Sequence, residues 1–370
     1  MKRKLVYIPG ILLFSLMLIG WGGTGHGLIG RSISLFFNQE MEQFNSWVSY
    51  IDDHSSDADD RKSVDPSESP KHYIDIDYYT EFITEGRIPQ TLDSVITLYG
   101  SFNVYDWGIL PWATITTYDS LKNCFIRRDF ERAKYFAADL SHYVGDGHMP
   151  LHITKNYNGQ LTDNDGIHSR YESTMINAHA SQIVFSGSSI SQIQDVQQYI
   201  FNYLYANYQY VDSILNADDY AKSINSSTSS SEYKTALWNK TRNFTIILFR
   251  NASHALTELI YTAWKEAGSP SLTGINDHEQ LTEISFSLDQ NYPNPFTDLT
   301  YISYSLKSTT WVNISVVNSQ GRVVSVLVDN YFTPGSYQVE WCGRNFPGGV
   351  YFVKMADNND QIVTKMLLVK

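Results

Sequence analysis

The segment Ser141-His142-Tyr143-Val144-Gly145-Asp146-Gly147-His148-Met149-Pro150-Leu151-His152 is the most informative stretch of this chain. His142 and Asp146 are four residues apart, so on a helix they share one face. His168 and Glu172 repeat this spacing, and His152 lies between the two pairs. Imidazole nitrogens and carboxylate oxygens form a ligand set suited to zinc. Two such pairs, in a chain with only ten histidines, predict a metal site.

The first residues of the chain differ in composition from the rest. Lys2, Arg3 and Lys4 precede an apolar run from Leu5 to Ile19, which ends at Gly20. This pattern is typical of a secretory signal peptide, and the run is too short for a stable membrane span. We expect residues 1–20 to be removed; an N-terminal membrane anchor is the alternative interpretation.

The remaining chain has the length and patterning of two domains. From Trp21 to about Ala267 the apolar spacing is helical, most clearly in 34–51, 129–144, 190–215 and 238–264. Residues 268–283 are rich in Gly, Ser, Pro and charge and are predicted to be a linker. Residues 284–370 contain short alternating runs between turn residues, at 301–306, 311–317, 323–328, 337–341, 350–355 and 362–369. We therefore predict a mainly α-helical domain over 21–267, followed by an immunoglobulin-like β-sandwich.

Cysteine content and charge set limits on the function. Cys124 and Cys342, the only cysteines, fall in different predicted domains, which argues against a disulfide framework. The formal net charge of −12 argues against a long polyanion as an obligatory partner. Metal ions in a cleft can nevertheless reverse the local field.

Three segments upstream of the opening motif hold further candidate ligands. They are Trp21-Gly22-Gly23-Thr24-Gly25-His26, Ser56-Asp57-Ala58-Asp59-Asp60-Arg61 and Lys71-His72-Tyr73-Ile74-Asp75-Ile76-Asp77. If cleavage makes Trp21 the first residue, its α-amine and carbonyl could chelate a metal beside His26. Together with the opening motif, these segments resemble the superfamily of zinc-dependent phospholipases C and single-strand-specific, 3′-nucleotidase-type nucleases. The resemblance covers most of residues 21–172.

The resemblance implies a site with three zinc ions. It assigns one ion to Asp59, His72, His142 and Asp146, and a second to His152, His168 and Glu172. The third would be held by the Trp21 amine and carbonyl, His26 and Asp146, with Asp146 bridging two ions. It also implies that a zinc-bridged hydroxide attacks phosphorus in line, with Asp59 and Asp146 as the carboxylates of the reacting centre.

Several residues near these ligands have more than one interpretation. Asp57 and Asp60 are alternatives to Asp59 as the metal ligand, although the Ala58-Asp59 dipeptide fits the superfamily best. His148 is expected in a loop or beside the ligands, with metal contact as the alternative. Asp75 and Asp77 could orient ligands, or could be solvated. A surface or structural role is expected for His54, His179 and His254, and either a substrate cleft or core packing for Tyr105, Trp107 and Trp112.

The sequence features disagree about the substrate. The spacing of Trp21 and His26 is that of the nucleases, whereas Glu172 and the short loop from His152 to His168 resemble the phospholipases. We therefore expect a secreted, phospholipase C-like phosphodiester hydrolase acting on phospholipid. The alternatives are a nuclease or 3′-nucleotidase acting on nucleic acid or nucleotides, another phosphoesterase, and a protein whose zinc sites are purely structural. No obligatory protein partner is evident for this domain.

The C-terminal domain has motifs of its own. Residues 288–296, 348–354 and 365–370 resemble the sorting domain of the type IX secretion system. The resemblance implies contact with the secretion machinery, export through the periplasm, and a final location outside the cell or on the outer-membrane surface. A β-sandwich that binds carbohydrate or acts as a spacer is the alternative. The domain has no histidine and no paired carboxylates that would suggest catalysis.

Overall fold

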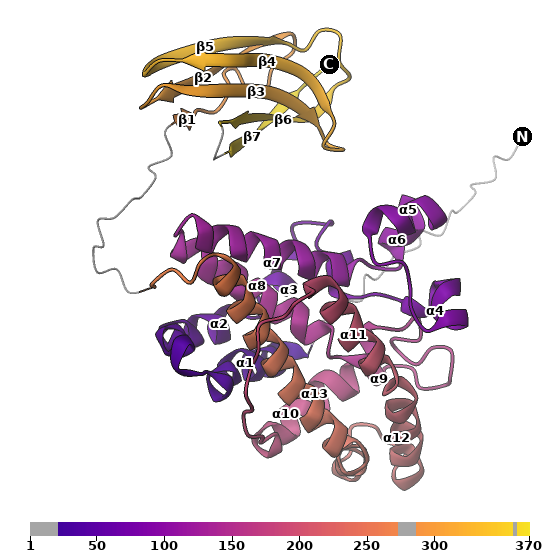
Figure 1. Ribbon diagram of the computed structural model, residues 1–370. Coiled ribbons are helices and arrows are strands. Elements are labelled where there is room, and N and C mark those ends of the chain that lie inside the picture. The colour runs from indigo at the N-terminus through magenta and orange to yellow at the C-terminus, as the bar shows by residue number, and fades with distance from the viewer. Residues whose placement is uncertain (1–20, 273–285, 358–360) are drawn as a thin grey trace, which may run out of the picture. The chain divides into compact units, whose positions relative to one another are not determined.

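The computed structural model describes residues 21–272, 286–357 and 361–370 (Figure 1). The predicted signal peptide, at 1–20, and most of the predicted linker lie outside these residues. The chain divides into two compact units, residues 1–274 and 275–370, and each is described by itself. As the sequence predicts, the first is helical and the second is built from β-strands. Within the described residues, no helix is both long and apolar enough to cross a membrane.

The helical unit combines long helices with short, irregular ones. Its α-helices are α1 (Gly22–Ser32), α2 (Val48–His54), α3 (Asp57–Arg61), α4 (Thr80–Glu85), α5 (Leu92–Tyr99), α6 (Ser101–Asp106), α7 (Leu110–Ile126), α8 (Phe130–Asp146), α9 (Ile167–Ser169), α10 (Ile176–His179), α11 (Val196–Tyr208), α12 (Val211–Ile224) and α13 (Ser231–Glu266). Short 3₁₀ segments are Ile33–Phe36, Gln39–Trp47, Ser69–His72, Ile76–Tyr78, Pro150–His152 and Ala180–Gln182. A π-helical segment, Arg170–Met175, follows α9.

The core of this unit forms where α7, α8 and α13 pack together (Figure 1). Helix α13 begins at Ser230, whose side chain accepts a hydrogen bond from the Tyr233 backbone N–H. Its buried hydroxyls, such as that of Thr241, donate to the carbonyl four residues earlier, so they need no partner outside the helix. Helix α8 begins similarly at Asp129, which accepts from the Arg132 N–H.

The segment 34–51, predicted as one helix, is broken in the structure. Phe37 takes an extended conformation, and Asn38 caps a new 3₁₀ segment by accepting from the Met41 N–H. Met41, Phe44 and Trp47 are all buried. Their spacing of three residues matches the three residues per turn of a 3₁₀ helix, so this geometry keeps them on one face. The apolar pattern thus located the buried face but not the type of helix.

The start of the predicted linker packs against the helical unit. The Trp264 indole N–H donates to the Pro270 carbonyl at 2.8 Å, and the Leu272 N–H donates to Gln43 Oε1 at 2.9 Å. Residues up to 272 are therefore tied to the helices.

The second unit consists of two antiparallel sheets. One sheet has the order β1–β2–β5, formed by Phe286–Leu288, Leu299–Leu306 and Gly335–Cys342. The other has the order β4–β3–β6–β7, formed by Val323–Phe332, Thr310–Asn318, Gly349–Ala356 and Gln361–Leu368. Every predicted strand is present, and β4 is longer than its pattern suggested. Alternate residues such as Ile302, Ile314 and Val353 are fully buried and form the core. Cys124 and Cys342 are both free.

Candidate metal centre

Seven elements of the helical unit bring the predicted ligands together. Helix α8 ends in the opening motif and places His142 and Asp146 on its buried face, where both are 0% exposed. The other predicted ligands lie on α1 (His26), α3 (Asp59), the 3₁₀ segments (His72 and His152), α9 (His168) and the π-helical segment (Glu172). Residues far apart in sequence thus meet around the C-terminal end of α8.

Asp59, His72, His142 and Asp146 form the first group. Asp146 Oδ2 lies 3.1 Å from His72 Nδ1 and 3.2 Å from His142 Nε2. Asp59 Oδ1 lies 3.5 Å and 3.6 Å from the same two nitrogens, which are themselves 2.9 Å apart. Ligand atoms about 2.0–2.1 Å from a tetrahedral zinc lie roughly 3.3–3.4 Å from one another. The group therefore has the dimensions of a closed four-ligand zinc site.

His152, His168 and Glu172 form the second group. The two imidazole Nε2 atoms are 3.2 Å apart, and Glu172 Oε2 lies 3.4 Å from the first and 3.0 Å from the second. The π-helical turn keeps His168 and Glu172 facing the same point. These distances also match a tetrahedral zinc, but with three protein ligands and one position left for water or substrate, as in catalytic zinc sites.

His26 and Asp146 form the third group, next to Trp21. His26 Nε2 lies 3.5 Å from Asp146 Oδ1, so the Asp146 carboxylate faces the first group with one oxygen and the third with the other. The Trp21 indole N–H donates to the Gly145 carbonyl at 2.8 Å, which fixes the start of the described chain beside Asp146. The Trp21 carbonyl accepts from the Gly25 N–H. A Cβ at Gly145 would lie 2.8 Å from His26 Nδ1, so only glycine admits this ring.

Several atoms of these groups are buried without a hydrogen bond. They include both nitrogens of His26, Asp146 Oδ1 and Glu172 Oε2. Each of the two carboxylate oxygens has imidazole nitrogens within 3.5 Å, yet the geometry is not that of a hydrogen bond. Buried polar atoms are normally satisfied. These atoms point towards a common centre and not towards one another. A metal ion at that centre would satisfy them, so the residues fit zinc.

The carboxylates dominate the electrostatics of the metal-free centre. Burial would lower the pKa of His142, but Asp146 and Asp59 outweigh burial and raise it to about 9. Burial also opposes the charged form of His152, yet Asp146 and Glu172 raise its pKa to about 10. Burial together with His142 lowers the pKa of His26 to about 3. Burial would raise the pKa of Asp146, but His142 and His152 hold it well below its usual range.

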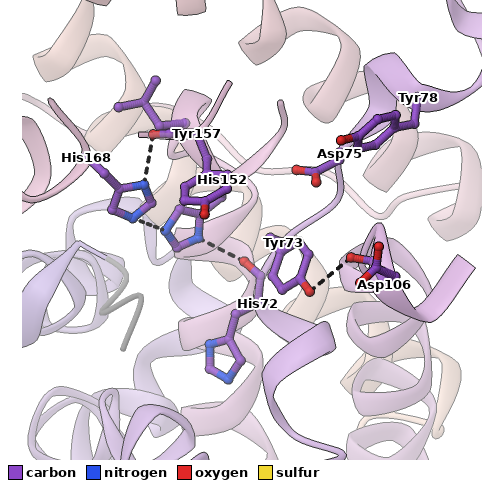
Figure 2. Close-up of a pocket in the computed structure, with 9 residues that line it drawn as sticks. His72, Tyr73, Asp75, Tyr78, Asp106, His152, Tyr157 and His168 are labelled. Carbon is purple, nitrogen blue, oxygen red and sulfur yellow. Dashed lines mark hydrogen bonds between the residues drawn. The ribbon is translucent and has the colours of Figure 1, made fainter. Parts of the chain in front are cut away.

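A cavity of about 270 Å³ opens beside the second group (Figure 2). Its lining includes His152 and His168, together with the aromatic and acidic side chains of Tyr73, Asp75, Tyr78, Asp106 and Tyr157. The Asp75 carboxylate faces the cavity, and burial, followed by the charges of Asp77 and Asp106, raises its pKa to about 8. His72 of the first group also lines the cavity, so small molecules can reach the second group and one edge of the first.

The remaining histidines and aspartates lie outside the three groups. Asp57 Oδ2 pairs with His54 Nδ1 at 2.8 Å, and Asp60 is exposed, so Asp59 alone of the three aspartates joins the cluster. His148 is buried, with Nδ1 against the Val144 carbonyl at 2.8 Å.

Among the other ambiguous residues, His179 stacks on Trp238, and His254 Nε2 lies 3.0 Å from the Ser189 carbonyl. Asp77 accepts hydrogen bonds from Thr154 and Lys155, and so braces the loop after His152. Trp112 packs in the core.

The sequence did not single out some residues that the structure places around the site. Glu68 Oε1 lies 3.6 Å from His72 Nε2, and Asp106 and Tyr157 line the cavity. For Glu68, the only available signal was its position four residues before His72, which places both on one side of a helical turn. Asp106 and Tyr157 give no local signal, because the chain reaches the cavity only through folding.

The fold and the site define a helical unit with three adjoining groups of metal-ligating residues, followed by a separate β unit. Residues 290–370 match the family described as Secretion system C-terminal sorting domain. This domain marks the protein for export by type IX secretion to the cell surface or the extracellular space. No curated protein matches the chain.

Two solved structures are similar to this chain at low identity. The alpha toxin from Clostridium absonum shares 11% identity with a TM-score of 0.43, and the alignment covers 95% of this chain and 99% of that one. The Clostridium perfringens alpha-toxin from avian strain SWCP shares 11% identity with a TM-score of 0.40 and the same coverage.

Proposed function

We propose that the helical unit is a zinc-dependent phosphodiester hydrolase of the phospholipase C type, acting outside the cell. The observation that carries the proposal is the three-ligand group formed by His152, His168 and Glu172 at the wall of a cavity. Structural zinc sites are closed by four protein ligands, whereas catalytic ones keep a position open. This difference argues against a purely structural role for the second group.

The ligand assignment follows the three groups. Asp59, His72, His142 and Asp146 would hold one ion, His152, His168 and Glu172 a second, and Trp21, His26 and Asp146 the third. Bound zinc would act as a Lewis acid and lower the pKa of a coordinated water. The three ligand carboxylates would offset about half of six positive charges, so the centre would attract a phosphodiester anion.

The surroundings of the cavity favour a lipid substrate. Tyr78 and Asp106 line the cavity, and Phe102 and Tyr105 share a neighbouring hollow with Asp106. Phe102 is 83% exposed, Tyr78 46% and Tyr105 44%. Large apolar side chains gathered at the surface mark interaction sites, and here they border the proposed active site. The charge of Asp106 at the cavity would also oppose a polyanionic strand more strongly than a single phosphodiester.

A nuclease or 3′-nucleotidase activity remains the second candidate. Tyr78 stacks on Trp107, with ring centroids 5.1 Å apart, and aromatic platforms of this kind can receive a nucleobase. The same rings are suited to contact with a lipid interface or with a nucleobase. Measuring which substrate is hydrolysed distinguishes the two candidate functions.

The test is a side-by-side assay of purified protein on phosphatidylcholine micelles, single-stranded DNA and 3′-nucleotides, with and without a chelator. We expect chelator-sensitive hydrolysis of the phospholipid. Metal analysis should give about three zinc ions per chain. Full activity in a metal-free preparation would refute the zinc mechanism, and hydrolysis of DNA alone would favour the second candidate.

A surface variant sharpens the choice of substrate. Phe102→Asp should lower activity on micelles while leaving activity on a monomeric, short-chain phospholipid unchanged. Val184→Asp is the matched control, because Val184 is 73% exposed and does not line the cavity. Equal effects of the two variants on micelles would show that the exposed side chains beside the cavity do not contact lipid.

A further inference from the structure

We propose that Glu68 is a positioning residue for the first metal group: its carboxylate accepts the Nε2–H of His72 and so presents Nδ1 to the metal ion. This inference rests on the proposed zinc centre. It assigns a role to a side chain that is not itself a ligand.

Three of the other four histidine ligands are oriented by backbone carbonyls. His142 Nδ1 lies 2.7 Å from the Ser55 carbonyl, His152 Nδ1 lies 2.8 Å from the His72 carbonyl, and His168 Nδ1 lies 3.1 Å from the Tyr157 carbonyl. In each of these rings Nε2 is then the atom that faces the group. A neutral imidazole has one N–H and one lone pair, so the acceptor at one nitrogen determines which nitrogen binds metal.

His72 has the opposite orientation. Its Nδ1 faces the group, 3.1 Å from Asp146 Oδ2 and 2.9 Å from His142 Nε2. Its Nε2 is buried with no hydrogen-bond partner, and Glu68 Oε1 lies 3.6 Å away. A small rotation of either side chain would bring the two atoms to hydrogen-bonding distance. Relative to His72, the carboxylate of Glu68 thus occupies the position that a backbone carbonyl occupies relative to the rings of His142, His152 and His168.

Glu68 is held in this place as a buried anion. Its side chain is 2% exposed. Oε1 accepts from Arg61 Nη2 at 3.3 Å and from the Tyr143 hydroxyl, and Oε2 accepts from Lys71 Nζ at 2.7 Å. A buried carboxylate is stable only with such compensation.

The same network joins the elements that provide the metal ligands. Arg61 lies on α3, two residues after Asp59, and its guanidinium pairs with Asp139 on α8 at 2.9 Å and 3.0 Å. Tyr143, also on α8, directly follows His142 in sequence. Glu68 therefore connects α3, α8 and the 3₁₀ segment of His72 immediately behind the group. A carboxylate behind a histidine ligand fixes its tautomer and increases its basicity.

The test is zinc binding by the full chain with Glu68→Gln, measured by competition with chelators of graded affinity. The substitution keeps the shape of the side chain but removes its charge, so we expect the first group to bind zinc about 10–100-fold more weakly, with the other two sites unchanged. Glu131→Gln is the matched control, because it makes the same chemical change at a side chain that is 86% exposed and belongs to none of the metal groups. Its zinc affinities should stay close to those of the unchanged protein.

The outcomes separate this inference from the proposed function. If the unchanged protein binds no zinc, the proposed function fails. If it binds three ions and Glu68→Gln binds them equally tightly, Glu68 has no positioning role and the inference is overturned. Should Glu68→Gln not fold, ¹⁵N-histidine NMR of the unchanged, zinc-loaded protein decides: a proton on His72 Nε2 supports the inference, and a proton on Nδ1 refutes it.

Discussion

Replacing Asp146 with Asn tests whether one carboxylate serves two metal positions. In the structure, Asp146 Oδ2 faces His72 and His142, whereas Oδ1 faces His26 and His152. Asp146→Asn keeps the shape of the side chain and removes its charge. The first and third groups should both lose zinc, and only the group of His152, His168 and Glu172 should remain.

The expected magnitude has two parts. In metal-free protein, removing one partner of a buried ion pair costs about 3–5 kcal/mol of unfolding free energy. With free zinc at about 100 times Kd, each occupied site adds about 2.7 kcal/mol, so three sites add about 8 kcal/mol and a single site about 2.7 kcal/mol. The stabilisation produced by zinc should therefore fall to about one third in Asp146→Asn.

Urea unfolding in the presence of a chelator measures the unfolding free energy of the metal-free protein. Urea unfolding with zinc, together with metal analysis, measures the stabilisation produced by zinc. His148→Ala is the control, because His148 is buried two residues away and makes one hydrogen bond to the Val144 carbonyl. It should lose about 1–3 kcal/mol, bind three zinc ions and keep the full stabilisation by zinc. Three bound ions in Asp146→Asn, or loss of zinc in His148→Ala, would show that the ligands are misassigned.

Three further predictions concern processing, pH and the second unit. N-terminal sequencing of the active, exported protein should begin at Trp21, and an added tag there should remove one zinc; another start would exclude the amine ligand. Without metal, the unfolding free energy should be greatest near pH 6.5. The raised pKa values of His142 and His152 give stability that is complete below 6.5 and is lost as pH rises through about 9 and 10. The lowered pKa of His26 gives stability that is complete above 6.5 and is lost as pH falls towards about 3. A stability that still increases from pH 6.5 to 9 in urea titrations would contradict this. Deleting residues 284–370 should leave zinc content and turnover nearly unchanged but stop export, as measured by activity in the medium and the periplasm; normal export or lost turnover would refute it.

The periodicities of the sequence predicted most of the secondary structure. The alternating runs after residue 284 correspond to strands, because a strand buried on one face must alternate apolar and polar residues. The segment 34–51 was mistaken for a single helix. Spacings of three and of three-and-four residues are nearly indistinguishable over so short a range, and the extended Phe37 leaves no mark in the apolar pattern.

By itself the sequence determined which residue types could ligate metal and which pairs would share a helical turn, because spacing along a helix fixes side-chain direction. It therefore indicated His142 with Asp146, and His168 with Glu172. The tertiary structure alone decided that Asp59, not Asp57 or Asp60, meets His72 and His142, because one turn of α3 aims neighbouring carboxylates in different directions. Only the fold could bring Glu68, Asp106 and Tyr157 to the site. Their roles depend on distances between elements that are remote in sequence, and such distances are set by packing of the whole core.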